Sequence, residues 1–166
     1  GESLLGLIED ILLFSKAEND KIDLAQEPFV LNHIVRSVHE SFLPLVEKQH
    51  NNIALSICAE ALRPVIGDAR RIRQVLVNLV GNANKFTTDG RIIVSVEALP
   101  HEAGHLALRI RVSDTGIGIP QDKLKLVFNR FQTLDPSYSR RTDGTGLGLA
   151  ICDKLILAIL LQKYIV

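Results

Sequence analysis

Residues 74–86, QVLVNLVGNANKF, combine an apolar stripe with a polar one. The apolar side chains recur at the spacing of a helix with one buried face, namely at Ile72, Val75, Leu76, Leu79, Val80, Ala83 and Phe86. At about 100° per residue, Asn78, Asn82 and Lys85 fall together beside that face, and Gln74 and Arg71 continue the same line. A helix that only packs needs no such stripe. Two amides and an ammonium group along the edge of a core suit an anionic ligand that carries a metal ion.

The composition is that of an ordinary globular domain. The chain has 166 residues, of which 46% are hydrophobic and 23% charged, and this excludes wholesale disorder. The formal net charge is zero, which argues against nucleic acid as a partner. No apolar run approaches the roughly 18 residues of a membrane span.

The N-terminal residues predict a helix that needs a partner. Leu4, Leu7, Ile11 and Phe14 occupy a and d positions of a heptad pattern. We therefore expect the N-terminal helix, within residues 1–18, to pack against another helix of a bundle or against a second copy of the chain, and residues 19–29 to be a linker. The alternative, that this helix packs back on its own domain, stays open.

The rest of the chain predicts helices and strands in alternation. The signals are capping residues, apolar periodicity and turn residues. In chain order they first indicate a helix capped by Asn32 and kinked or split at Pro44, a strand over Ile53–Cys58, a short strand at Val65–Ile66 and the 74–86 helix capped by Asp68. A turn at Thr88–Gly90 follows, and then an antiparallel hairpin of Arg91–Ala98 and Leu106–Val112. The last elements are a short helix over Gln121–Phe128, a surface loop over Gln132–Gly144 and a final apolar helix.

Two glycine-rich turns carry further chemical signals. Asp114–Pro120, DTGIGIP, follows a predicted strand, so its carboxylate could accept a hydrogen bond from an exocyclic amine such as that of adenine. Gly144–Leu149, GTGLGL, opens the last helix, where free backbone N–H groups favour phosphate. Taken singly, a tight turn and a flexible hinge remain the alternatives. Between them, Arg130 lies next to Phe131 and could reach a terminal phosphate in a bidentate manner.

Together these motifs resemble the catalytic and ATP-binding domain of sensor histidine kinases, in the superfamily that includes gyrase and the ninety-kilodalton chaperone. Asn78–Thr87 resembles the N box, Asp114–Pro120 the G1 box, Phe128 to Phe131 the F box, and Gly144–Leu149 the G2 box, in the same order. The resemblance covers roughly residues 1–155.

The resemblance implies a fold and a set of site residues. The fold is an α+β two-layer sandwich, with a mixed, mainly antiparallel sheet, helices on one face, an ATP lid near Gln132–Asp143 and the N-terminal bundle helix. Residues 1–18 would be the C-terminal part of a dimerisation helix, and residues 30–166 would form the ATP-binding domain. Asn82 would hold Mg²⁺, and the catalytic residues would be Asn78, Lys85 and Arg130. The implied ATP contacts are Asn78, Asn82, Lys85, Phe86, Asp114, Gly116, Gly118, Phe131, Thr145, Gly146, Leu147 and Gly148.

One position favours phosphoryl transfer over hydrolysis. In the hydrolysing relatives, the residue four before the Mg²⁺-binding Asn is a Glu that activates water, whereas here it is Asn78. An amide cannot act as a general base at neutral pH. We therefore expect a protein-histidine kinase core that donates the γ-phosphoryl group of ATP to a histidine. A degenerate regulatory module that binds a nucleotide or a partner, or an ATP-hydrolysing clamp, is the alternative.

The acceptor histidine is expected on a preceding helix outside this chain. His39–Glu40 resembles the acceptor dipeptide but lies within the ATP-binding region, so we interpret His39 as a surface residue and expect no autophosphorylation. The implied partners are a histidine-bearing dimerisation domain, a response regulator receiver domain and a second copy of the chain. The implied location is cytoplasmic, and because most family members are membrane receptors, this implies the cytoplasmic part of such a receptor as one alternative. The C-terminal residues LAILLQKYIV depart from the family, which continues with a Gly-Gly turn and two strands, so we expect a truncated domain.

Overall fold

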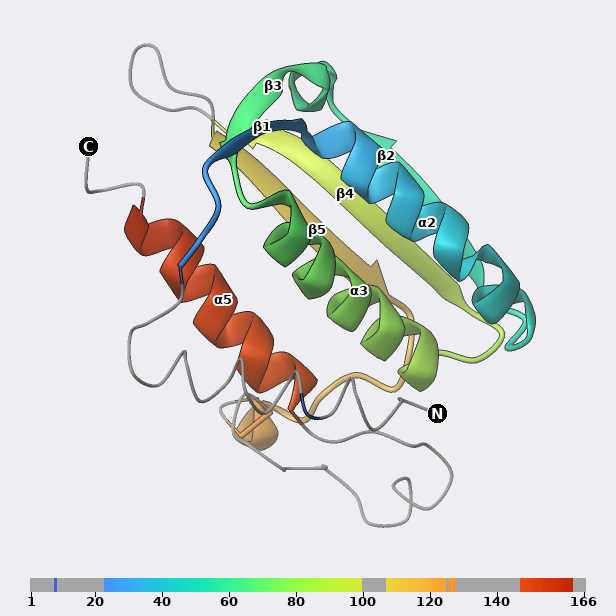
Figure 1. Ribbon diagram of the computed structural model, residues 1–166. Helices are drawn as coiled ribbons and strands as arrows, with labels where there is room; N and C mark the ends of the chain where they lie inside the picture. Colours follow the sequence, from blue (N-terminus) through green and yellow to red (C-terminus); the bar gives the residue numbers. More distant parts are fainter. Residues whose placement is uncertain (1–7, 9–22, 100–106, 125, 128–146, 163–166) are drawn as a thin grey trace. The chain divides into compact units, whose positions relative to one another are not determined.

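The computed structural model describes residues 8, 23–99, 107–124, 126–127 and 147–162. The chain divides into two compact units, residues 25–118, and residues 1–24 with 119–166. The first unit contains β1 (Glu27–Val30), α2 (Leu31–Glu47), β2 (Asn52–Ile57), the 3₁₀ turn η1 (Ala59–Leu62), β3 (Pro64–Gly67), α3 (Ala69–Phe86), β4 (Arg91–Leu99) and β5 (Ala107–Asp114) (Figure 1). The second contains the 3₁₀ turn η2 (Gln121–Lys123) and α5 (Gly148–Gln162).

A mixed three-stranded sheet organises the first unit. Its strand order is β2-β4-β5, with β2 parallel and β5 antiparallel to the central strand β4. Along β4 the side chains of Ile92, Val94 and Val96 are buried, and the residues between them are only partly covered. This alternation is the period of two that the sequence predicted for a strand with one buried face. A separate antiparallel pair joins β1 to β3.

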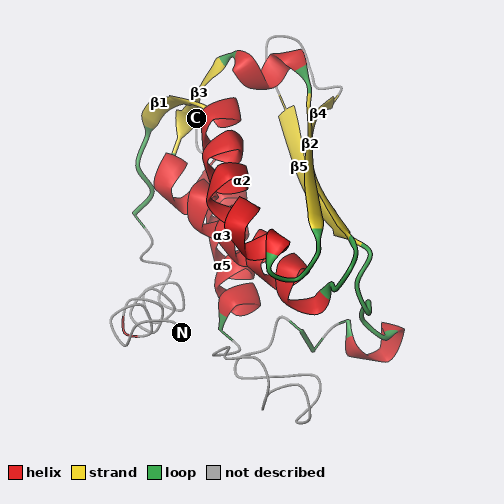
Figure 2. Ribbon diagram, turned by 90° about the vertical axis from the view of Figure 1, so that its right-hand side faces the viewer, coloured by secondary structure: helices red, strands yellow, loops and turns green. Residues whose placement is uncertain are grey.

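The helices α2 and α3 cover one face of this sheet, as Figure 2 shows from the side. Their inward residues form one core with the strands, which includes Val35, Val38, Leu76, Val80 and Ile92. The α+β sandwich with helices on one face is therefore confirmed in the first unit. Burying each of these side chains contributes about 1.5–3 kcal/mol, so the packing of α3 fixes the position of its polar stripe.

The start of α3 follows the predicted cap. Asp68 Oδ1 accepts a hydrogen bond from the backbone N–H of Arg71 at 2.9 Å, which satisfies one of the free N–H groups of the first turn. Its second oxygen, Oδ2, accepts the backbone N–H of Ala25 at 3.0 Å. One carboxylate thus fixes both the helix start and the incoming chain.

The N-cap predicted for α2 was wrong. The helix begins at Leu31 with Val30 as an uncapped N-terminal residue, because strand β1 runs directly into it. Asn32 lies inside the first turn, where its Oδ1 accepts a hydrogen bond from Arg36 Nε at 3.0 Å. The helix continues through Pro44, so the split does not occur, while the alternative of a kink stays a prediction. Pro44 and Glu40 are both exposed, so water can replace the bond that proline cannot donate.

Two further segments differ from expectation. The helix predicted over Gln121–Phe128 is, in the described residues, the 3₁₀ turn Gln121–Lys123 followed by turn residues. Leu124 and Val127 do have the i, i+3 spacing of a helix, but Leu124 and Leu126 are exposed and only Val127 is buried, so little apolar burial supports a longer helix here. Strand β1 was not anticipated, and it begins within the segment expected to be a linker. The division into domains stays a prediction.

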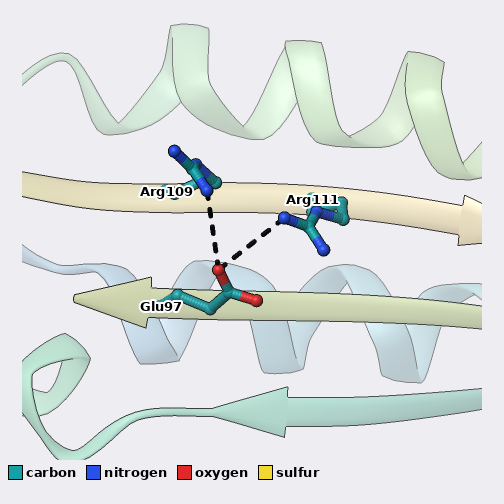
Figure 3. A network of polar contacts seen from close by, with 3 residues as sticks. All are labelled: Glu97, Arg109 and Arg111. Atoms are coloured by element: carbon teal, nitrogen blue, oxygen red, sulfur yellow. Dashed lines mark ion pairs between the residues drawn. The ribbon is translucent and has the colours of Figure 1, made fainter. Parts of the chain in front are cut away.

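The outer face of the sheet is polar. Arg109 and Arg111 of β5 share the carboxylate of Glu97 on β4, at 4.0 and 3.8 Å (Figure 3). All three side chains are about half exposed, so these ion pairs contribute little to stability.

Several expectations concern residues outside those described. They are the bundle helix apart from Ile8, the surface loop over 132–144, the Arg130 and Phe131 region, and the last four residues of the chain. Within the described part, none of the helices has the length and apolar character needed to cross a membrane.

Candidate nucleotide site

The polar stripe of α3 borders the core as predicted. Asn78, Asn82 and Lys85 are partly buried, while Leu76 and Val80 on the neighbouring face are 2% and 0% exposed. At the start of the stripe, Arg71 Nη1 donates a hydrogen bond to Gln74 Oε1 at 3.0 Å. The stripe therefore presents its amides and its ammonium group at the edge of a rigid, packed helix.

Phe86 was predicted on the buried face and is instead 36% exposed. The buried position one turn after Val80 belongs to Asn84, which is 7% exposed. Phe86 is the last residue of the helix, and its ring lies 5.3 Å from Lys85 Nζ, a cation–π distance. An aromatic surface thus lies beside the cation at the end of the stripe.

Asp114 ends strand β5 next to the C-terminus of α3. Its Oδ1 accepts the backbone N–H of Gly116 at 2.9 Å and the hydroxyl of Thr87 at 3.5 Å. The backbone N–H of Ile117 donates to the carbonyl of Phe86 at 3.2 Å. Residues far apart in the sequence, the end of α3 and the Asp114 turn, are therefore held together by hydrogen bonds.

The two glycines of this turn meet different requirements. A Cβ on Gly116 would overlap the carbonyl oxygen of Phe86 and lie 2.8 Å from Thr87 Oγ1, so only glycine allows this close approach. Gly118 has a φ of +68°, a conformation that side chains disfavour, and nothing lies within 4 Å of a Cβ built there. One glycine lets the turn touch α3, and the other leaves open space beside it.

Sequence reasoning missed a buried polar cluster beneath this turn, formed by Asn51, Asn84 and Thr87. These residues are 9%, 7% and 1% exposed. Asn51 Nδ2 donates to Asn84 Oδ1 at 3.0 Å and to the carbonyl of Thr87 at 2.7 Å. The signal for Asn84 was present, because it follows Leu76 and Val80 at intervals of four on the core face.

The remaining predicted contacts belong to the second unit or to residues outside those described. Leu147, which is 2% exposed, and Gly148, the first residue of α5, belong to the second unit. The four other predicted residues, Arg130, Phe131, Thr145 and Gly146, lie outside the described residues.

His39 is not a simple surface residue. It is partly buried on α2, and its Nε2 lies 3.3 Å from the carbonyl oxygen of Ile53 on β2. The sequence placed His39 at the surface of a helix; its ring is only partly exposed, because α2 packs this side of the helix toward the sheet. A ring held against a strand is a poor candidate for a phosphoryl acceptor.

Comparison with known proteins identifies the family. Residues 67–165 match the family model described as histidine kinase-, DNA gyrase B- and HSP90-like ATPase. The signal transduction histidine-protein kinase BarA of Escherichia coli K12 is 39% identical over 157 residues, which cover 93% of this chain and 17% of BarA.

Solved structures of histidine kinases are also similar to this chain. Full-length ShkA in complex with AMPPNP superposes with a TM-score of 0.78 at 33% identity, over 93% of this chain and 31% of that one. The nucleotide-free catalytic domain of histidine kinase ThkA gives 0.66 at 30% identity, over 83% and 82%.

The chain therefore belongs to the histidine kinase-, gyrase B- and HSP90-like ATPase family, as a histidine kinase catalytic domain. It spans 9–17% of the length of the first curated relatives that it matches.

Proposed function

We propose that the chain binds ATP with Mg²⁺ and donates the γ-phosphoryl group to a histidine on a dimerisation domain. The observation that carries this proposal is the hydrogen-bonded junction between the polar helix α3 and the Asp114 turn. The AMPPNP complex of the related ShkA supports nucleotide binding by this fold.

In this proposal Asp114, Phe86 and the two glycines receive adenine. Both bonds to Asp114 within the first unit are accepted by Oδ1, so Oδ2 is the oxygen that we assign to the exocyclic amine. We assign a flat ring to the side of Gly118, where nothing lies within 4 Å of a Cβ, and the exposed ring of Phe86 would offer it an apolar surface.

The phosphates are assigned to the polar stripe. The Asn82 amide oxygen would coordinate Mg²⁺, a cation that prefers oxygen ligands and usually shares them with substrate phosphates. Asn78 and Lys85 would contact phosphate oxygens. Arg130 would stabilise charge on the transferred group, and Phe131 would contact the nucleotide. Thr145, Gly146, Leu147 and Gly148 would offer backbone N–H groups at the start of α5. Bound Mg²⁺ would neutralise the charge that develops on the phosphates.

Asn78 favours transfer over the hydrolysing alternative. A water molecule near the γ-phosphate would need a general base to become a good nucleophile, and such a base contributes about 10²–10⁴-fold to a rate. An amide supplies none. The site would thus hold ATP until an acceptor arrives.

The acceptor and the later steps belong to the longer protein. We propose a dimer formed through the helix before residue 19, transfer onward to a response regulator receiver domain, and a cytoplasmic position for this domain. No part of this scheme involves nucleic acid.

Radiolabelled ATP tests the proposal. The chain is incubated with [γ-³²P]ATP and Mg²⁺, alone and with the dimerisation helices of a histidine kinase as acceptor. We expect acid-labile label on the acceptor only. Label on this chain, or fast release of inorganic phosphate without transfer, would contradict the assigned role.

A further inference from the structure

We propose that Asn51, in the turn between α2 and β2, is a positioning residue for the adenine side of the nucleotide site. Nothing in the four family motifs assigns a role to this turn. The inference rests on the proposed function for its nucleotide readout, but its structural part is independent of it.

The carboxamide of Asn51 makes three hydrogen bonds that hold two segments together. Its Nδ2 donates to Asn84 Oδ1 at 3.0 Å and to the carbonyl of Thr87 at 2.7 Å. Its Oδ1 accepts the backbone N–H of Gly90 at 3.0 Å. No other side chain type of this size both donates twice and accepts. The residue is 9% exposed, so water cannot easily replace these bonds.

Gln49, in the same turn between α2 and β2, provides a second set of hydrogen bonds to the C-terminus of α3. With its amide nitrogen turned toward α3, Gln49 donates to the carbonyls of Asn84 at 2.7 Å and Thr87 at 3.0 Å. Carbonyls at a helix end lack intrahelical partners and need such donors. The backbone of Gln49 also accepts the N–H of Asp89 at 3.2 Å. The turn therefore clamps both the end of α3 and the loop that follows it.

Two sets of hydrogen bonds connect the residues held by Asn51 and Gln49 to the Asp114 turn. Phe86 lies between the clamped residues Asn84 and Thr87, and its carbonyl accepts the N–H of Ile117 at 3.2 Å. Gly90 precedes Arg91, whose N–H donates to Thr115 Oγ1 at 3.0 Å and whose carbonyl accepts the N–H of Thr115 at 3.1 Å.

Asn51 thus fixes both segments on which the turn rests. Displacing either one moves the turn that carries the carboxylate assigned to adenine. Because Gly116 packs closely against Phe86, the Asp114 turn cannot stay in place when Phe86 moves.

The Asn51→Asp variant tests this arrangement. It keeps the size of the side chain and the acceptor for Gly90, but it removes both donated bonds and directs negative charge at Asn84 Oδ1 and the Thr87 carbonyl. Val35→Ala serves as the control, since Val35 is 1% exposed in the core on α2, and its loss lowers stability without touching the clamp. Asn51→Ser replaces the aspartate variant if that protein does not fold.

Two readouts separate positioning from general destabilisation. The first is the ¹H–¹⁵N spectrum without nucleotide, in which the Gly116 and Ile117 amide signals should shift in the Asn51 variant and stay unchanged in Val35→Ala. The second is ATP affinity, measured where all proteins are folded, which should fall at least about tenfold in the Asn51 variant and less than about twofold in the control.

The outcomes are distinguishable. If the wild-type chain does not bind ATP, the proposed function fails, and the amide shifts alone decide the positioning role. If the wild type binds ATP, the inference is overturned by an Asn51 variant with unmoved Gly116 and Ile117 signals. It is also overturned by equal losses of affinity in the Asn51 and Val35 variants.

Discussion

Replacing Gly116 with alanine tests whether the contact between the Asp114 turn and α3 holds the carboxylate in place. The new Cβ would overlap the carbonyl oxygen of Phe86 and lie 2.8 Å from Thr87 Oγ1 and 2.9 Å from Asp114 Oδ1. The first obstacle is backbone and cannot rotate away. The turn must therefore move off α3, which breaks the bond from Ile117 N–H to Phe86 at 3.2 Å and strains the bond from Gly116 N–H to Asp114 at 2.9 Å.

The expected magnitudes follow from these contacts. Overpacking costs about 1–3 kcal/mol, and each lost hydrogen bond costs about 1 kcal/mol, so the free energy of unfolding should fall by roughly 2–4 kcal/mol. A misplaced carboxylate also loses a hydrogen bond to the ligand that involves a charged group. Such a bond is worth about 1.5–3 kcal/mol, or roughly ten- to hundredfold in ATP affinity.

Gly118→Ala is the matched control for stability. Its φ of +68° disfavours alanine, but nothing lies within 4 Å of the new methyl group, so the cost is about 1–2 kcal/mol. Urea unfolding gives the stabilities and isothermal titration calorimetry gives the affinities. A Gly116→Ala protein that is as stable as Gly118→Ala, and that binds ATP within twofold of the wild type, would refute the reasoning.

Three further variants probe other parts of the account. Asn82→Ala should weaken ATP binding at least about tenfold in Mg²⁺ and leave it unchanged in excess EDTA; an equal loss in both buffers would sink the metal assignment. Asn78→Glu should raise the rate of phosphate release from ATP at least about tenfold, because it introduces a general base; an unchanged rate would argue against our reason for preferring transfer. Glu97→Ala should alter the free energy of unfolding by less than about 0.5 kcal/mol, because its ion pairs are half exposed, whereas Leu76→Ala in the core should cost about 2–5 kcal/mol; comparable losses in urea unfolding would contradict this ranking.

Periodicity was sufficient to predict the main elements of the first unit. The strands β4 and β5 and the helix α3 each bury one face, and burial is what imposes a repeat on the sequence. The Asp68 cap was predictable for a similar reason, since a local hydrogen bond needs only neighbouring residues.

The predictions from sequence failed where contacts between residues far apart in the chain determine the structure. Strand β1 has only four residues, and its pairing with β3 depends on residues far along the chain. The start of α2 at Leu31 follows from that strand and not from the local preference of Asn32. Phe86 was assigned to the core because it is apolar, while the polar Asn84 takes the buried position through its bond to Asn51.

The sequence motifs predicted a set of site residues, which stays a prediction, but they did not predict the contacts that hold those residues in position. The motifs named Asn82, Asp114 and Gly116 without three-dimensional information. They could not reveal that Asn51, which lies outside every motif, donates to the end of α3. Such buried polar contacts join residues 33 and 36 positions apart, and no local pattern encodes them.

Titration of Mg²⁺–AMPPNP into the chain tests the central claim, that the polar stripe of α3 and the Asp114 turn form a nucleotide site. We predict saturable binding to one site per chain, reduced at least about tenfold by Asp114→Ala and unaffected by Glu40→Ala, which removes an exposed carboxylate on α2. The absence of binding, or binding that Asp114→Ala leaves unchanged, would contradict the account.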